Sequence, residues 1–99
     1  MKPPVELTDR ALKEVRNILK NKGIPPGYGL RLGVRGRGCA VAFKLGFDKK
    51  RETDVEYFIE DLQVLIGKGE MMFLVGKRVE FYDESDGRGF LFVDPEQAG

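Results

Sequence analysis

The spacing of the apolar residues changes at Gly-Ile-Pro-Pro-Gly (23–27), and this change constrains the fold most strongly. Before it, apolar side chains recur at helical spacing within residues 8–22, namely Leu12, Val15, Ile18 and Leu19. We therefore expect one N-terminal helix, with Thr8 as its N-cap. After the Pro-Pro stretch the apolar residues alternate with polar residues or glycine, which is typical of strands with one buried face.

The second part of the chain predicts short strands joined by turns. We expect strands at residues 28–35, 41–47, 55–61, 62–67, 79–84 and 90–93. The ten residues from Gly67 to Gly76 favour a short second helix over alternation. These elements predict a compact, β-rich α+β domain over residues 1–99, built mostly from antiparallel strands with one N-terminal helix and one short second helix.

Composition excludes several classes of function. The 99 residues suffice for one domain with its own core. The chain has 17 basic and 16 acidic residues, and this near-neutral balance argues against a dedicated nucleic-acid binder. No apolar run approaches the roughly 20 residues that span a bilayer. No hydrophobic signal region opens the sequence and one cysteine cannot form an intrachain disulfide, so we expect a cytoplasmic protein.

Histidine is absent from the sequence. This excludes the Ser-His-Asp and Cys-His catalytic sites, and it also excludes zinc sites built on histidine. We expect a protein that is not an enzyme.

The only cysteine, Cys39, follows a glycine-rich segment. Gly36 and Gly38 allow positive φ angles and leave backbone N–H groups open, while Arg35 and Arg37 favour the thiolate form of the cysteine. Two interpretations remain open, a small buried apolar residue or a functional thiolate. A single thiolate is too few ligands for a metal unless another molecule supplies the rest. The glycine spacing matches neither the phosphate-loop nor the dinucleotide motif.

Charge is distributed unevenly. Residues 31–51 contain seven basic residues and one acidic residue, whereas residues 52–61 contain five acidic residues and no basic one. The two segments either form solvated faces that pair across a hairpin, or the first forms a basic patch that steers an anionic partner. The apolar segment 71–75 is expected in the core, with a dimer or partner surface as the alternative.

Four motifs give the chain a resemblance to a known family. They are T-D-x-A-L-x-x-V at residues 8–15, G-L-R-L-G-V-R-x-x-G-C at residues 29–39, F-D-K at residues 47–49 and G-F-x-F-x-[ND]-P at residues 89–95. The chain resembles the A-type iron–sulfur cluster carriers, the HesB/IscA-like proteins. The resemblance implies a β-rich fold, a homodimer or homotetramer, and cluster-assembly or client apo-proteins as partners.

The family uses three cysteines, and the first of them matches Cys39. The other two follow the last strand, where this sequence has residues 96–99, Glu-Gln-Ala-Gly. The resemblance therefore implies an iron–sulfur cluster or iron bound by Cys39, with Arg35, Gly36, Arg37 and Gly38 supporting the turn. Clusters are normally held by four thiolates, so two copies of Cys39 and two small thiols such as glutathione would complete the set.

Two other functions remain open. A cluster-free domain of this family could act as a protein-interaction module that docks on client apo-proteins. A redox protein could use Cys39 as a nucleophile that a small thiol caps reversibly, although the sequence has no resolving cysteine.

Overall fold

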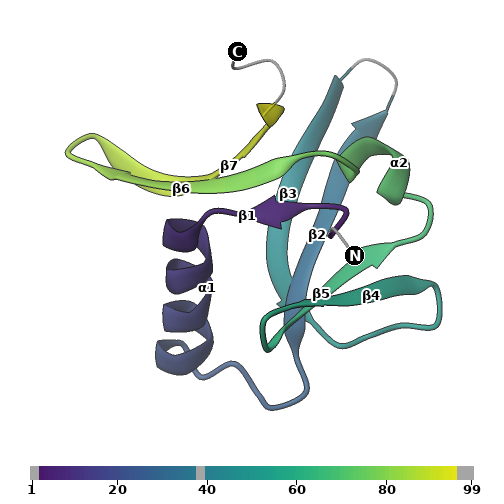
Figure 1. The fold of residues 1–99 in the computed structure, drawn as a ribbon, viewed down its shortest axis with the longest axis horizontal. Coiled ribbons are helices and arrows are strands. Elements are labelled where there is room, and N and C mark those ends of the chain that lie inside the picture. Colours follow the sequence, from purple (N-terminus) through teal and green to yellow (C-terminus); the bar gives the residue numbers. More distant parts are fainter. Residues whose placement is uncertain (1–2, 38–39, 96–99) are drawn as a thin grey trace. The chain divides into compact units, whose positions relative to one another are not determined.

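The structure is a computed structural model that describes residues 3–37 and 40–95. Its elements are shown in Figure 1. The contacts divide the chain into two compact units. Among the described residues, the first unit lies within 25–75, and the second contains 3–24 together with 76–95. The single domain over residues 1–99 stays a prediction.

The first unit is a four-stranded mixed sheet in the order β3-β2-β5-β4. The elements are β2 (Gly29–Arg37), β3 (Ala40–Asp48), β4 (Asp54–Ile59), β5 (Leu62–Gly67) and the one-turn helix α2 (Met71–Leu74). β2 pairs antiparallel with β3 along its whole length, and it pairs in parallel with β5 only at residues 30–32. The β4–β5 turn contains Glu60, whose φ is +57°.

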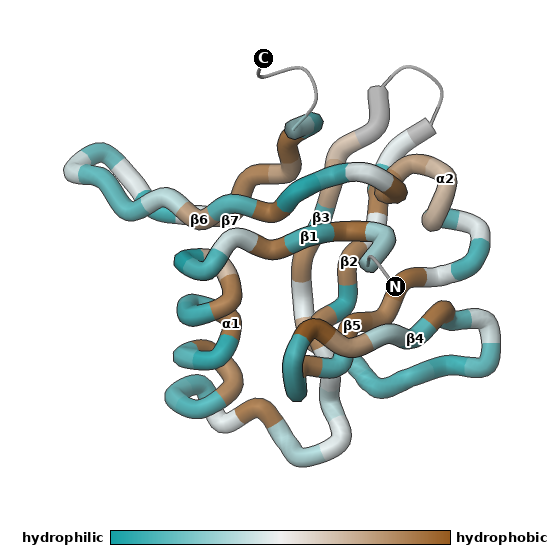
Figure 2. The backbone as a smooth tube through the Cα atoms, in the orientation of Figure 1, coloured by the Kyte–Doolittle hydropathy of each residue, from teal (hydrophilic) through white to brown (hydrophobic). Residues whose placement is uncertain are grey.

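β5 carries much of the buried surface of this unit. Val64, Leu65 and Ile66 are fully buried, and Leu62 is nearly so. Successive residues of a strand point to opposite faces of the sheet, so the burial of these three consecutive residues shows that both faces of β5 are covered, and its sequence is almost continuously apolar. Figure 2 shows this strand in brown. Leu30 and Leu32 of the neighbouring β2 are also fully buried.

The second unit combines one helix with a three-stranded sheet in the order β1-β6-β7. Its elements are β1 (Glu6–Leu7), α1 (Asp9–Asn21), β6 (Arg78–Glu84) and β7 (Gly87–Val93). The Thr8 hydroxyl accepts a hydrogen bond from the Ala11 N–H at 3.1 Å, which caps α1 as expected. Gly23 follows the helix with a φ of +67°. In Figure 2 the apolar residues of α1 gather on one side of the helix.

The predicted α+β class with antiparallel hairpins and two helices is confirmed. Two differences stand out. β1 was not expected, because two residues are too short to show alternation. β7 begins at Gly87, three residues before the expected start. No helix in the part of the chain that the structure describes is long and apolar enough to cross a membrane.

The expectation that segment 71–75 lies in the core was wrong for most of its residues. Leu74 is fully buried, but Met72 is 75% exposed and Val75 is 59% exposed. Phe73 is also largely exposed. A helix with 3.6 residues per turn directs about one residue per turn inward, so a four-residue helix buries one side chain and presents the others.

Candidate functional site

The β2–β3 hairpin leads to Cys39. Arg37 and Ala40 are paired at the end of the hairpin, and the two residues between them in sequence, Gly38 and Cys39, lie outside the described residues. The ligand role of Cys39 therefore stays a prediction. Of the supporting residues, Arg35 and Gly36 are exposed on β2, and Arg37 is its last residue.

Gly36 has a backbone conformation that favours glycine. Its φ is +108°, in a region that residues with a Cβ rarely adopt. The same residue is paired with Val41 on β3. A glycine at this position therefore lets β2 stay paired with β3 up to the last residues before Gly38.

The basic excess of this hairpin is partly neutralised within the unit. The Arg31 guanidinium donates two hydrogen bonds to the Asp54 carboxylate, at 2.7 and 2.6 Å. Its Nε donates to Asp48 at 3.1 Å, and a fourth N–H, on Nη2, donates to the Lys49 carbonyl at 3.0 Å. Arg31 thus holds the β3–β4 connection against β2. This contact realises the expected pairing between the basic and acidic segments, but it is buried rather than solvated, since Asp54 is 6% exposed.

These contacts shift the pKa values of the groups involved. The hydrogen bonds from Arg31 lower the pKa of Asp54 to about 2, because they stabilise its charged form. The pKa of Asp48 is lowered as well, first by the hydrogen bond from the Lys49 backbone N–H. The pKa of Arg31 is raised, first by its hydrogen bonds to Asp54. All three groups are therefore charged at neutral pH.

A cavity of about 210 Å³ lies on the same hairpin, and residues of β2 and β3 line it. Besides the Arg31–Asp48 pair, it presents two exposed cationic side chains, Arg35 and Lys44. Within the described part of the chain, neither of the two forms an ion pair. This cavity can therefore offer two free cations to an anion. Arg35 is four residues before Cys39 in the sequence.

Glu70, which no sequence motif singles out, supports the outer half of β2. The Glu70 carboxylate accepts a hydrogen bond from the Val34 N–H at 3.0 Å. β5 no longer pairs with β2 at this point, because their pairing ends at Leu32. A Cβ on Gly33 would lie 3.1 Å from a Glu70 carboxylate oxygen, and one on Gly67 would lie 3.0 Å away. The glycines thus give the carboxylate room between the two strands.

Among residues 3–37 and 40–95, no group of three or more histidine, cysteine, aspartate or glutamate side chains is placed to hold a metal ion. Cys39 falls outside those ranges.

Known proteins of one family resemble this chain in both sequence and structure. No family model matches the chain. The chain is 38% identical over 93 residues to an iron-binding protein IscA from Enterobacter sp. (strain 638), covering 92% of this chain and 85% of that protein. The structure matches Escherichia coli SufA, a protein involved in biosynthesis of iron–sulfur clusters, with a TM-score of 0.75 at 25% identity over 93% of this chain and 81% of that one.

The fold also matches a crystal structure of IscA with a [2Fe–2S] cluster, with a TM-score of 0.71 at 24% identity over 92% of this chain and 82% of that one. The family motifs quoted above span both units, and the identity to IscA extends over nearly the whole chain. This protein belongs to the IscA/SufA family of HesB-like, A-type iron–sulfur cluster carriers, whose members are carrier proteins rather than enzymes.

Proposed function

We propose that this protein carries an iron–sulfur cluster as its cargo and that Cys39 is the thiolate that holds it. The observation that carries the proposal is the 38% identity to an iron-binding IscA over 92% of the chain. The single cysteine of the sequence lies at the family's first cysteine position, between β2 and β3. Chemistry supports the choice, because thiolates are the usual ligands of such clusters.

The number of ligands requires further molecules. A [2Fe–2S] cluster is normally held by four thiolates, and this sequence contains one cysteine. Two copies of the chain and two small thiols such as glutathione complete the set. The exposed cations Arg35 and Lys44 support the binding of an anionic thiol such as glutathione. The carboxylates of such a thiol can form charge-assisted hydrogen bonds with these cations.

The proposal also covers the compartment, the oligomeric state and the partners of the protein. It acts in the cytoplasm as a homo-oligomer and exchanges its cluster with assembly proteins and client apo-proteins. The lone cysteine supports a reducing compartment, and a shared cluster requires at least two copies.

The test is anaerobic reconstitution of the wild type and of Cys39→Ser with iron and sulfide, with and without glutathione. We expect a visible sulfide-to-iron absorption band after desalting in the wild type with glutathione, and loss of that band in Cys39→Ser. Arg35→Gln should reduce the gain in the absorption band that glutathione gives. Lys50→Gln, at an exposed lysine outside the cavity, serves as the matched control. A band of equal strength in Cys39→Ser would overturn the proposal.

The exposed side chains around α2 favour a second function, that of a cluster-free interaction module. Met72, Phe73 and Val75 present apolar surface to solvent, which often marks a protein contact. This function predicts no absorption band in either protein. It also predicts that Met72→Gln lowers the affinity for an apo-protein client while Cys39→Ser leaves that affinity unchanged. Equal client affinities of the wild type and Met72→Gln would argue against it.

A further inference from the structure

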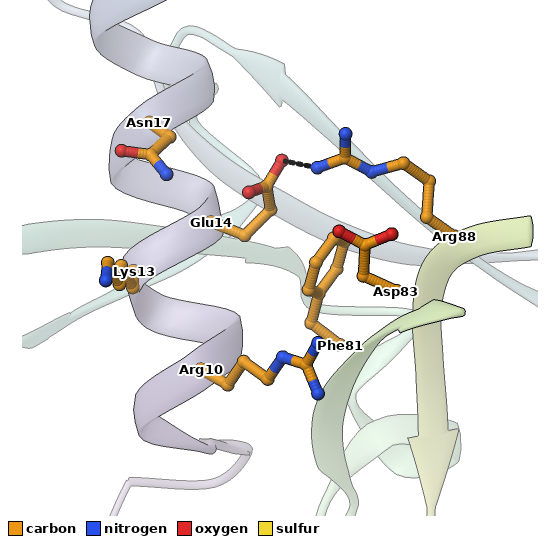
Figure 3. A pocket seen from close by; sticks show the side chains of 7 residues that line it. All are labelled: Arg10, Lys13, Glu14, Asn17, Phe81, Asp83 and Arg88. Atoms are coloured by element: carbon orange, nitrogen blue, oxygen red, sulfur yellow. Dashed lines mark hydrogen bonds and ion pairs between the residues drawn. The ribbon is translucent and has the colours of Figure 1, made fainter. Parts of the chain in front are cut away.

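A second cavity lies entirely within the second unit, where α1 meets the β6–β7 hairpin (Figure 3). Its volume is about 220 Å³. The helix contributes Arg10, Lys13 and Glu14, and the hairpin contributes Phe81, Asp83 and Arg88. The volume lies below the roughly 300–1,000 Å³ that is usual for pockets of drug-sized ligands. A single side chain therefore suits this cavity better than a cofactor.

The Phe81 ring orients two guanidinium groups in this cavity. The Cζ atom of Arg10 lies 5.9 Å from the ring centre, and that of Arg88 lies 5.4 Å away. Phe81 itself packs on Phe90, with ring centres 5.0 Å apart. A guanidinium that rests on an aromatic ring keeps its N–H groups free for hydrogen bonds, and their planar fork matches a carboxylate.

The charges of the cavity leave a positive excess on its helix side. Glu14 accepts a hydrogen bond from Arg88 at 3.1 Å, so these two charges offset each other. The other carboxylate, Asp83, comes from the hairpin side, as Figure 3 shows. Arg10 and Lys13 are exposed on α1, one turn apart, and neither forms an ion pair with another residue in the described ranges.

We propose that this cavity docks the carboxylate of an aspartate or glutamate side chain from a partner protein. The carboxylate binds to Arg10 and Lys13, and the methylene groups of the incoming side chain pack on Phe81. Charge complementarity selects this occupant, because the two cations on the helix side lack a carboxylate of their own. The proposal does not depend on cluster binding, since none of these residues belongs to the β2–β3 hairpin.

The test uses the apo-protein and a capped Gly-Glu-Glu-Gly peptide, with a capped Gly-Gln-Gln-Gly peptide and acetate as comparison ligands. NMR titration at low salt would follow the Arg10 and Arg88 side-chain Nε–H signals and the Lys13 amide signal. We expect saturable shifts with the acidic peptide only, and a loss of affinity as ionic strength rises, because exposed charges are screened.

Variants locate the binding. Lys13→Gln and Arg10→Gln should each lower the affinity for the acidic peptide by roughly two- to fivefold, the typical effect of removing one exposed ion pair. Lys20→Gln, at an exposed lysine of α1 outside the cavity, should leave the affinity unchanged. Three results would each overturn the proposal: no shifts with the acidic peptide, equal binding of the glutamine peptide or of acetate, or an equal effect of Lys20→Gln.

Discussion

At the scale of the residue, Arg31 and Asp54 form a buried ion pair in the first unit. The side chain of Asp54 is 1% exposed. Its carboxylate accepts two hydrogen bonds from Arg31 and a third from the Arg51 backbone N–H at 2.7 Å. A buried carboxylate is tolerated only when it is paired and hydrogen-bonded in this way. The pair therefore fixes the charged β3–β4 connection beside β2.

This contact makes the stability of the protein sensitive to acid. The pKa of Asp54 is lowered from 3.8 to about 2 in the folded chain. The stabilisation is therefore fully present above about pH 4 and is lost as the pH falls through about 2, and it amounts to about 2 kcal/mol. We expect Asp54→Asn to lower the free energy of unfolding at pH 7 by about 3 kcal/mol, since it leaves Arg31 without its main partner.

Urea unfolding between pH 2 and pH 7 measures both effects. Asp54→Asn should also show a flatter dependence of stability on pH between about 4 and 2. Glu52→Gln, an exposed position in the same connection, should retain the wild-type profile. Identical profiles for the wild type and Asp54→Asn would contradict this assignment.

At the scale of the element, Thr8 defines the start of α1. Its hydroxyl satisfies the Ala11 N–H, one of the donors that a helix leaves unpaired at its first turn. Thr8→Ala should therefore lower the free energy of unfolding by about 1 kcal/mol, whereas Thr8→Ser keeps the hydroxyl and should remain close to the wild type. Thermal or urea unfolding of the three proteins measures the difference, and equal losses in both variants would show that the hydroxyl is not the cause.

The outer half of β2 depends on Glu70. Glu70→Ala leaves the Val34 N–H without its carboxylate acceptor, which should cost about 1–2 kcal/mol. Hydrogen exchange of the Val34 amide should then become faster, while Glu70→Gln retains an acceptor and should show a smaller change. If the Val34 amide exchanged at the same rate in the wild type and Glu70→Ala, Glu70 would not be its partner in solution.

At the scale of the whole molecule, the proposed cluster sets a stoichiometry. A [2Fe–2S] cluster shared by two chains contains about one iron and one sulfide per chain. We expect this ratio in the reconstituted wild type, together with the mass of at least two chains in solution. Iron and sulfide assays combined with light scattering give both values. A cluster bound by a single chain, with about two irons per chain, would contradict the shared site.

Local features of the sequence predicted much of the fold. Helical spacing and Thr8 located α1, and alternation located β2 and β3. The position of Cys39 between two strands also followed from the sequence, because alternation resumes after the glycines. The short strand β1 and the exposure of Met72 were not predicted, since neither a two-residue strand nor a one-turn helix contains enough residues for a periodic pattern.

The sequence by itself determined the helix, most of the strands, the family and the single thiol, because each depends on local spacing or on a contiguous motif. Only the tertiary structure decided which distant residues meet. Val34 and Glu70 are 36 residues apart, and Glu14 and Arg88 are 74 residues apart. Local periodicity specifies the face on which a side chain lies. The partner of that side chain depends on which distant segments the tertiary fold brings together, because the same charged face can pair with any opposite charge that lies near it.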